Sequence, residues 1–257
     1  LKMLVSTRCI FPDFAITWLS GMNEAKLSPT SLYKKLTPEL IKELGLENGV
    51  EGSMSVFLLE AEGKKALFDT GLPFKISKGI LDRLNELKIS RDEIDYIFIT
   101  HFHLDHIGGL LDENDNVAFK NAKIYVSKKE YDAWINNTPS DKNQMQVNIM
   151  KKCEKQIVQF DYNEKLPLGV KQIESFGHTP GHTLFQKGDL LIIGDLIHGQ
   201  DIQFKYPEIC ASYDQDENAS IESRKKGLKY AEDNKLLVAG MHLKYSNSSM
   251  FRGFYKK

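Results

Sequence analysis

The chain has 257 residues, of which 41% are hydrophobic and 27% charged, and its formal net charge is −1. That length suits one large domain or two small ones, and the composition is ordinary for a globular protein. The balance of 34 basic and 35 acidic residues lacks the basic excess of a general nucleic-acid binder. Every apolar run is shorter than the ~20 residues of a membrane helix. We therefore expect neither nucleic acid nor membrane among its partners.

Three cysteines, Cys9, Cys153 and Cys210, lie far apart and form no CxxC pair. We therefore expect partly buried thiols and no disulfide framework. The amino end is no complete signal peptide, because Asp13 follows soon after a short apolar run. We expect a cytoplasmic protein, or an exported one if a signal peptide was removed.

Residues 8–36 show no regular pattern, and long irregular stretches are often lids or binding loops. An apolar cluster lies within them. Two interpretations are open. The cluster is either ordinary core or an edge that packs against the sheet, or else it forms a lid over an apolar acyl or aryl group or a dimer contact. The cluster consists of Phe11, Phe14, Trp18, Leu19 and Met22.

Along the rest of the chain, β-rich runs alternate with helical patterns, which favours an α/β layered fold. The dipeptide Glu62-Gly63 separates two such runs and predicts a hairpin turn. The predicted strands cover residues 54–61, 64–71, 94–100, 122–127, 170–176, 190–195 and 235–242. The predicted helices cover residues 37–46 (with Thr37 as N-cap), 76–90, 128–137 and 219–234. Residues 138–165 have no clear pattern.

Residue types that bind metals follow five of these strands. If the strands share one sheet region, their ends can meet at one rim. The residues are Asp69, the segment His101–His106, the GHTPGH motif at 177–182, Asp195 and His242. The chain has seven histidines, and all of them belong to these segments or lie within four residues of one.

The densest segment reads Thr-His-Phe-His-Leu-Asp-His. Alternate residues of an extended chain point the same way, so His101 and His103 can bind one ion. Asp105 and His106 follow after a turn and can face a second ion. The pair Gly108-Gly109 permits a tight path into the next helix. Imidazole and carboxylate are ligands that zinc and similar ions accept.

A purely structural zinc site is the main alternative to a catalytic one. Structural sites are usually closed, four-coordinate and rich in cysteine. Here no cysteine takes part, and the candidate ligands outnumber the needs of one ion. The pattern therefore favours catalysis.

The motifs together resemble the metallo-β-lactamase superfamily. The resemblance rests on Thr100–His106, the GHTPGH motif, Gly194-Asp195, His242 and the FDTG motif at 68–71. Neighbouring segments resemble the subgroup of methyl parathion hydrolase and quorum-quenching lactonase-like enzymes. After His242, however, this chain lacks the Pro-Phe-Pro-like stretch that this subgroup tends to have.

The resemblance implies an α/β fold. It is a four-layer αβ/βα sandwich with the metal site at the rim between two mixed sheets. Residues 1–257 would form a single domain, with 1–50 as an N-terminal extension or lid and 51–245 as the core.

The resemblance also implies roles for individual residues. The first metal takes His101, His103 and His182, and the second takes Asp105, His106 and His242. Asp195 bridges both ions. Three further residues would not bind metal: Asp69 accepts a hydrogen bond from a ligand imidazole, His178 shapes its loop, and His198 supports a ligand or contacts substrate.

We expect two divalent ions, zinc by default, with manganese, iron or cobalt as alternatives. A hydroxide shared by the ions would attack an ester, lactone or phosphotriester bond in a small molecule. The candidate catalytic residues are Asp105, Asp195 and His198.

Two other functions stay open. A thioesterase of the glyoxalase II kind usually has a basic C-terminal helical segment, and only fifteen residues follow His242 here. A non-catalytic metal-binding protein on the same scaffold would be expected to have lost ligands. A homodimer also stays open.

Overall fold

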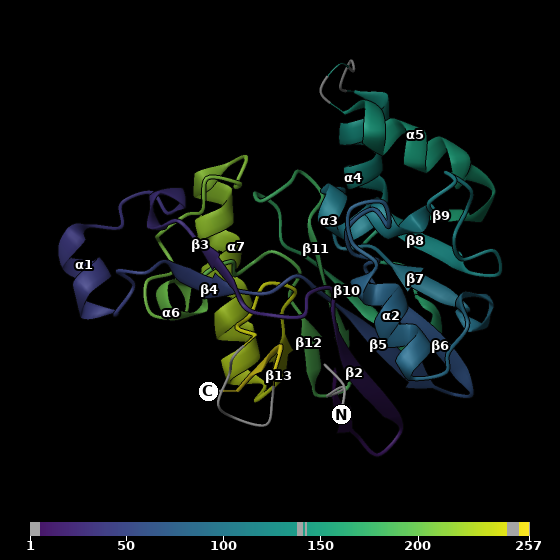
Figure 1. The fold of residues 1–257 in the computed structure, drawn as a ribbon, viewed down its shortest axis with the longest axis horizontal. Coiled ribbons are helices and arrows are strands. Elements are labelled where there is room, and N and C mark those ends of the chain that lie inside the picture. The colour runs from purple at the N-terminus through teal and green to yellow at the C-terminus, as the bar shows by residue number, and fades with distance from the viewer. Residues whose placement is uncertain (1–5, 138–140, 142, 246–251, 257) are drawn as a thin grey trace. The chain divides into compact units, whose positions relative to one another are not determined.

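The computed structural model describes residues 6–137, 141, 143–245 and 252–256. The chain divides into two compact units, whose elements are labelled in Figure 1. Unit 1 joins residues 1–23 to residues 54–170, and unit 2 joins residues 24–53 to residues 171–257. Each unit therefore combines an early and a late part of the chain.

Among the residues that the structure describes, no helix combines the length and apolar character needed to cross a membrane.

Unit 1 contains a seven-stranded mixed sheet. The first four strands in sheet order pair antiparallel, and the last four pair parallel. In sheet order, the strands are β1 (Ser6–Ile10), β2 (Phe14–Ser20), β5 (Ser55–Ala61), β6 (Lys64–Phe68), β7 (Tyr96–Phe98), β8 (Lys123–Ser127) and β9 (Ile157–Phe160).

The hairpin between β5 and β6 confirms the predicted turn at Glu62-Gly63. Ala61 pairs with Lys64, so two residues form the loop. Glu62 and Gly63 have φ values of 54° and 70°. Positive φ at both positions gives the loop the twist that matches the flanking strands.

Strands β1 and β2 lie in a segment for which no regular structure was predicted. Every residue of β2 is buried, and Trp18 and Leu19 are fully so. Strand β2 is an inner strand of the sheet, between β1 and β5. Because its residues are buried on both faces, its sequence lacks the apolar–polar alternation of a half-exposed strand. Of the two interpretations of the apolar cluster, the structure supports core for these residues.

The helices of unit 1 complete its hydrophobic core. Buried Ile80 and Leu84 of α2 belong to the same core cluster as Leu58 and Ile97 of the sheet. The helices are α2 (Gly79–Glu86), α3 (Leu104–Ile107), α4 (Lys128–Tyr131), which continues into a π-turn at Asp132–Asn136, and α5 (Gln144–Lys152). Helix α5 falls in a stretch without a predicted element.

Unit 2 contains a five-stranded mixed sheet and a two-stranded one. The five strands, in sheet order, are β10 (Lys171–Glu174), β11 (Thr183–Lys187), β12 (Leu190–Ile192), β13 (Leu237–Ala239) and β14 (Phe254–Tyr255). The two-stranded sheet pairs β3 (Lys26–Ser28) with β4 (Val50–Gly52). The helices are α1 (Pro38–Glu43), α6 (Gln200–Gln203) and α7 (Glu217–Asp233).

Helix α7 packs on the five-stranded sheet of unit 2. Its Ala231 and Leu228 share a core cluster with Leu191 and Val238 of the sheet. At α1, Thr37 is the N-cap as predicted, since its side chain accepts a hydrogen bond from the Leu40 backbone N–H at 3.3 Å. The two mixed sheets with their helices confirm the predicted α/β fold class.

All seven predicted strands exist, but several end earlier than predicted. Strands β6, β7, β12 and β13 end at Phe68, Phe98, Ile192 and Ala239. The candidate ligands therefore lie in the loops that follow the strands, where the backbone is free to turn. Ser246, at the end of the stretch that departs from the subgroup, lies outside the described residues.

The position of Trp18 predicts a role in stability. Trp18→Ala should lower the free energy of unfolding by about 3–5 kcal/mol, because it removes a fully buried aromatic side chain. Ile10→Ala is the control, since Ile10 is 80% exposed and its loss should cost less than about 0.5 kcal/mol. Urea unfolding measures both. Equal stability of the two variants would contradict a core position for β2.

Candidate metal centre

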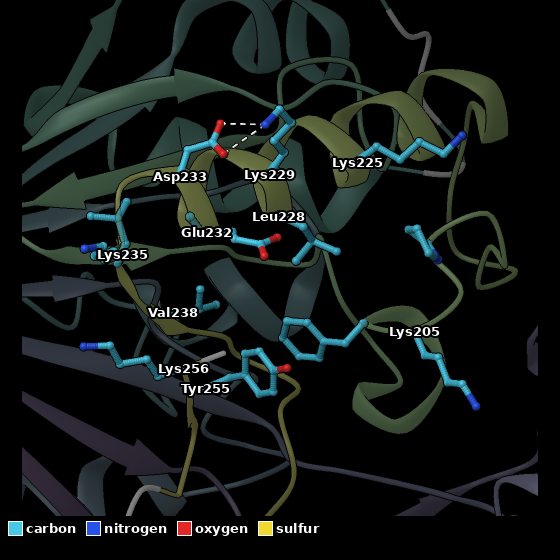
Figure 2. Close-up of a pocket in the computed structure, with 14 residues that line it drawn as sticks. Lys205, Lys225, Leu228, Lys229, Glu232, Asp233, Lys235, Val238, Tyr255 and Lys256 are labelled. Carbon is cyan, nitrogen blue, oxygen red and sulfur yellow. Dashed lines mark hydrogen bonds and ion pairs between the residues drawn. The ribbon is translucent and has the colours of Figure 1, made fainter.

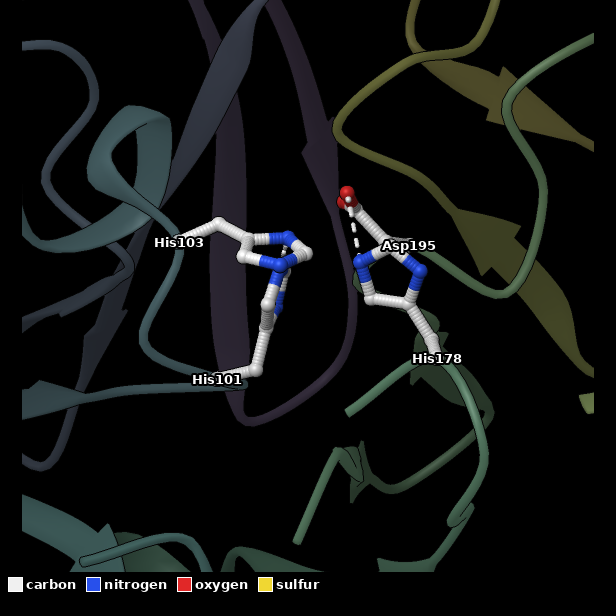
Figure 3. A group of neighbouring side chains, drawn as sticks. All are labelled: His101, His103, His178 and Asp195. Atoms are coloured by element: carbon white, nitrogen blue, oxygen red, sulfur yellow. Dashed lines mark hydrogen bonds and ion pairs between the residues drawn. The ribbon is translucent and has the colours of Figure 1, made fainter. Parts of the chain in front are cut away.

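The loop after β7 brings the histidine-rich motif of unit 1 into a small space. His101 Nε2 lies 3.0 Å from His103 Nδ1, and Figure 3 shows the two rings meeting through these atoms. The rings of His101 and His106 are 4.0 Å apart between centroids. His106 Nε2 lies 3.7 Å from Asp105 Oδ2. The motif therefore forms one cluster of donor atoms.

Asp69 organises this cluster from the end of β6. Its carboxylate accepts hydrogen bonds from the Thr100 backbone N–H at 2.8 Å and the Thr100 hydroxyl at 2.7 Å. It also lies 2.6 Å from His106 Nδ1. Burial raises the pKa of Asp69, and the contacts with His106 and Thr100 oppose that rise. Asp69 has a φ of 62°, a left-handed conformation that aspartate tolerates better than most residues.

These hydrogen bonds determine which imidazole nitrogen carries the proton. Because Asp69 accepts from His106 Nδ1, the lone pair of His106 is at Nε2. The Thr100 hydroxyl donates to Asp69, so it can accept from His101 Nδ1, which is 3.0 Å away. The lone pair of His101 is then also at Nε2. One carboxylate thus orients two imidazoles.

Gly108 and Gly109 are needed for space rather than for backbone freedom. Gly108 has an ordinary helical φ of −61°. A Cβ at Gly108 would lie 2.3 Å from Pro73 Cδ, and one at Gly109 would lie 2.2 Å from the Thr70 carbonyl oxygen. The glycines let α3 approach the loop after β6, which contains Asp69.

Two residues that sequence reasoning missed also support this loop. The Glu130 side chain, buried at the start of α4, accepts a hydrogen bond from the Phe102 backbone N–H at 2.9 Å. The Trp134 ring lies edge-on to His103, 5.7 Å away. Nothing in the local sequence distinguishes Glu130 from an exposed helical glutamate.

In unit 2, three imidazoles surround the carboxylate of Asp195. The Nε2 atoms of His178, His198 and His242 lie 3.3, 3.1 and 3.2 Å from its oxygens. The side chains of Asp195, His178 and His198 are buried, and that of His242 is 13% exposed. Asp195 and His178 are drawn in Figure 3. The structure thus brings together Asp195 and His242, which were predicted to bind metal, with His178 and His198, which were not.

The structure places His178 and His182 differently from the prediction. His182 Nε2 accepts a hydrogen bond from the Asp195 backbone N–H at 3.0 Å, and its Nδ1 lies 3.1 Å from the Ser175 carbonyl oxygen. Both ring nitrogens of His182 therefore face backbone groups, which does not suit a ligand. The Nε2 atom of His178 faces the Asp195 carboxylate instead, so the geometry favours His178 as the ligand of the GHTPGH motif.

The second nitrogen of His178 faces another carboxylate, that of Asp214. The Nδ1–Oδ1 distance is 2.9 Å. Burial lowers the pKa of His178, but hydrogen bonds to Asp195 and Asp214 outweigh it and raise the pKa to about 9. For Asp214, burial raises the pKa, but the hydrogen bond from His178 and nearby positive charges hold it well below its usual range.

His242 and His198 are fixed by other parts of unit 2. The His242 Nδ1 atom lies 2.8 Å from the Ser53 carbonyl oxygen, and the Ser53 hydroxyl lies within hydrogen-bonding distance of the Met241 and Leu243 carbonyls. The His198 backbone N–H donates to Gln203 Oε1 at 2.7 Å. Burial lowers the pKa of His198, which favours the neutral ring.

A separate groove of about 960 Å³ lies along α7 in unit 2 (Figure 2). Its apolar floor includes Leu228, Val238 and Tyr255, and lysines such as Lys225 and Lys235 lie around it. None of the residues that line it is a candidate ligand. We therefore assign the chemistry to the His/Asp clusters and not to this groove.

Comparison with known proteins identifies the family. A sequence profile described as the metallo-beta-lactamase superfamily matches residues 49–242, which is most of the chain. The chain belongs to this superfamily. The match spans every predicted metal-binding residue, from His101 to His242.

Three relatives within the superfamily show what the chain is similar to. An N-acyl homoserine lactonase of Bacillus thuringiensis is 30% identical over 166 residues, covering 54% of this chain and 62% of the lactonase. The solved structure of AidC, a dizinc quorum-quenching lactonase in complex with a product, is 26% identical. It covers 99% of this chain and 98% of AidC, with a TM-score of 0.82. The solved structure of the hydrolase AbOPH is 24% identical and covers 100% of this chain and 98% of the AbOPH chain, with a TM-score of 0.83. At this identity the likeness supports the fold alone.

Proposed function

We propose that this protein is a metal-dependent hydrolase that opens a lactone, or cleaves a related ester or phosphotriester, in a small molecule. One observation carries the proposal: all seven histidines of the chain lie in the two clusters that Asp69 and Asp195 organise. Histidines that served only packing or solubility would be scattered. Their gathering around buried carboxylates is typical of a metal centre.

The donor atoms fit divalent zinc or a similar ion. They are imidazole nitrogens and carboxylate oxygens, which borderline ions accept. Two nitrogens that bind one zinc at about 2.0–2.1 Å in a tetrahedral arrangement lie about 3.3 Å apart. The His101–His103 separation of 3.0 Å is close to that value. Burial of the unit 2 cluster also excludes bulk water from its polar atoms.

We propose that both clusters supply one dinuclear centre, as the family resemblance implies. His101, His103 and His178 would hold the first ion, with His178 in the role first expected of His182. Asp105, His106 and His242 would hold the second. Asp195 would bridge the two ions.

When bound, the two ions would supply Lewis acidity and lower the pKa of a water molecule toward neutrality. The chain's own residues would orient and move protons. Asp69 keeps the lone pairs of His101 and His106 at Nε2. His182 holds the Asp195 backbone in place. His198 Nε2 faces Asp195 Oδ2 at 3.1 Å and would orient that carboxylate. Asp195 would take up the proton that the attacking water releases and pass it to the leaving group.

The lactone is our first choice of substrate because of the relatives. The relatives of known activity include an N-acyl homoserine lactonase and AidC, a dizinc lactonase. The name of AbOPH indicates only a hydrolase, so phosphotriesters rest on the subgroup resemblance. A lactone and an open-chain ester are both hydrolysed by attack of water on an ester carbonyl. Aryl esters therefore belong to the same class of candidate substrates.

Metal removal tests the function directly. The zinc-loaded protein should hydrolyse N-acyl homoserine lactones, and both chelator-treated protein and His103→Ala should lose at least 100-fold in kcat/KM, about 2.7 kcal/mol of transition-state stabilisation. Lys225→Ala is the control, because Lys225 lines the separate groove and should leave the rate unchanged. Full turnover by metal-free protein would contradict the proposal. Turnover of thioesters alone would support the glyoxalase II alternative.

The exchange of His178 for His182 has its own test. His178→Ala should lose about one metal ion per chain, because it removes a ligand. His182→Ala should retain more metal but lose about 1–3 kcal/mol of stability, because it leaves the buried Asp195 N–H without its acceptor. Metal analysis and unfolding of the metal-free proteins measure the two effects. Loss of metal from His182→Ala alone would restore the original assignment.

A further inference from the structure

Arg224 is a buried cation inside a helix that otherwise looks like a charged surface helix. Its neighbours in α7 are Ser223 and Lys225, yet the Arg224 side chain is only 1% exposed. Its guanidinium donates from Nε to the Leu196 carbonyl at 2.8 Å and from Nη1 to the Pro207 carbonyl at 2.7 Å. A guanidinium with its donors satisfied in this way is fixed in one orientation.

The third contact of Arg224 leads to the candidate metal centre. Nη2 donates to Asp214 Oδ2 at 2.8 Å, and the other oxygen of Asp214 lies 2.9 Å from His178 Nδ1. A guanidinium can only donate, so the Asp214 carboxylate that binds Arg224 is held as an acceptor. His178 must then donate from Nδ1. This leaves its Nε2 atom, which faces Asp195, for a metal.

The backbone around Asp214 reinforces this placement. The Gln215 N–H donates to the His178 carbonyl at 3.2 Å, and the Asp216 N–H donates to the Gly177 carbonyl at 2.9 Å. Gly177 has a φ of 126°, and a Cβ there would lie 2.2 Å from the Ser220 nitrogen. The segment before α7 therefore holds the His178 loop by both main chain and side chain.

We propose that Asp214 and Arg224 are positioning residues that hold His178 in the tautomer and orientation needed to bind metal. This inference rests on the proposed function, since it assigns His178 to the metal centre. Neither residue touches the reacting atoms. A merely structural pair would stabilise unit 2 equally well without any effect on metal affinity, and that difference makes the proposal testable.

The test compares Asp214→Ala with Asp216→Ala in the full chain. Asp216 is the N-cap of α7, and its side chain accepts a hydrogen bond from the Ala219 N–H, so its loss destabilises the same segment without touching His178. Zinc affinity is measured by competition with a chromophoric chelator, and the visible spectrum of the cobalt-substituted protein reports ligand geometry. Thermal unfolding of the metal-free proteins reports stability.

We expect Asp214→Ala to lower the affinity for one of the two zinc ions by 10- to 100-fold and to change the visible spectrum of the cobalt-substituted protein. Asp216→Ala should lower the melting temperature and leave both affinities unchanged. If Asp214→Ala does not fold, Asp214→Asn keeps the volume and should still weaken the same ion, because an amide does not impose one tautomer on His178. Arg224→Lys keeps the charge and should be milder than Asp214→Ala.

The outcomes separate the two proposals. A wild-type protein that binds no zinc would overturn both this inference and the proposed function. A wild-type protein that binds two zinc ions, with Asp214→Ala and Asp214→Asn of unchanged affinity and spectrum, would overturn this inference alone.

Discussion

The hydrogen bond between an imidazole and a buried carboxylate is the interaction on which both candidate clusters depend. A carboxylate without partners is costly to bury, so the chain surrounds each one with donors. Asp69 lies 2.6 Å from His106 and also accepts from Thr100. Asp195 lies within 3.3 Å of three imidazoles. At Asp69 the contacts that satisfy the carboxylate also orient His106, and Asp214 orients His178 through Nδ1 in the same way. The Nε2 atoms that face Asp195 are those that would share a bound ion with it.

The two units use the same arrangement. In each, an aspartate follows the end of a strand: β6 ends at Phe68, directly before Asp69, and β12 ends at Ile192, three residues before Asp195. A buried strand is a rigid support, and the loop after it is free to turn a side chain toward its neighbours. The supporting residues come from further along the chain: Glu130 behind the loop of His101, and Asp214 behind His178. Function on this scaffold therefore depends on residues well outside the motifs themselves.

Much of the fold and site could be predicted from the sequence. Strand patterns that end in metal-binding residue types can be recognised without knowledge of the tertiary structure. The clustering of His101, His103 and His106 follows from their spacing. Strand β2 could not be found, because burial on both faces removes the alternation that marks a strand. Arg224 was hidden because its burial depends on carbonyl groups far away in the sequence.

The choice between His178 and His182 shows the limit most clearly. Both lie in one hexapeptide, and their residue type and spacing are equally suitable. The ring that faces Asp195 is determined by the left-handed backbone at Gly177 and by the hydrogen bonds from residues 214–216. None of these is a local property of the motif.

Anomalous diffraction at the zinc absorption edge, from crystals grown with zinc, tests the central claim most directly. The account predicts two strong peaks that share the Asp195 carboxylate. His178 Nε2 should contact one of them, and His182 should still face its backbone partners. A single peak, or none beside these imidazoles, would show that the chain holds no dinuclear centre.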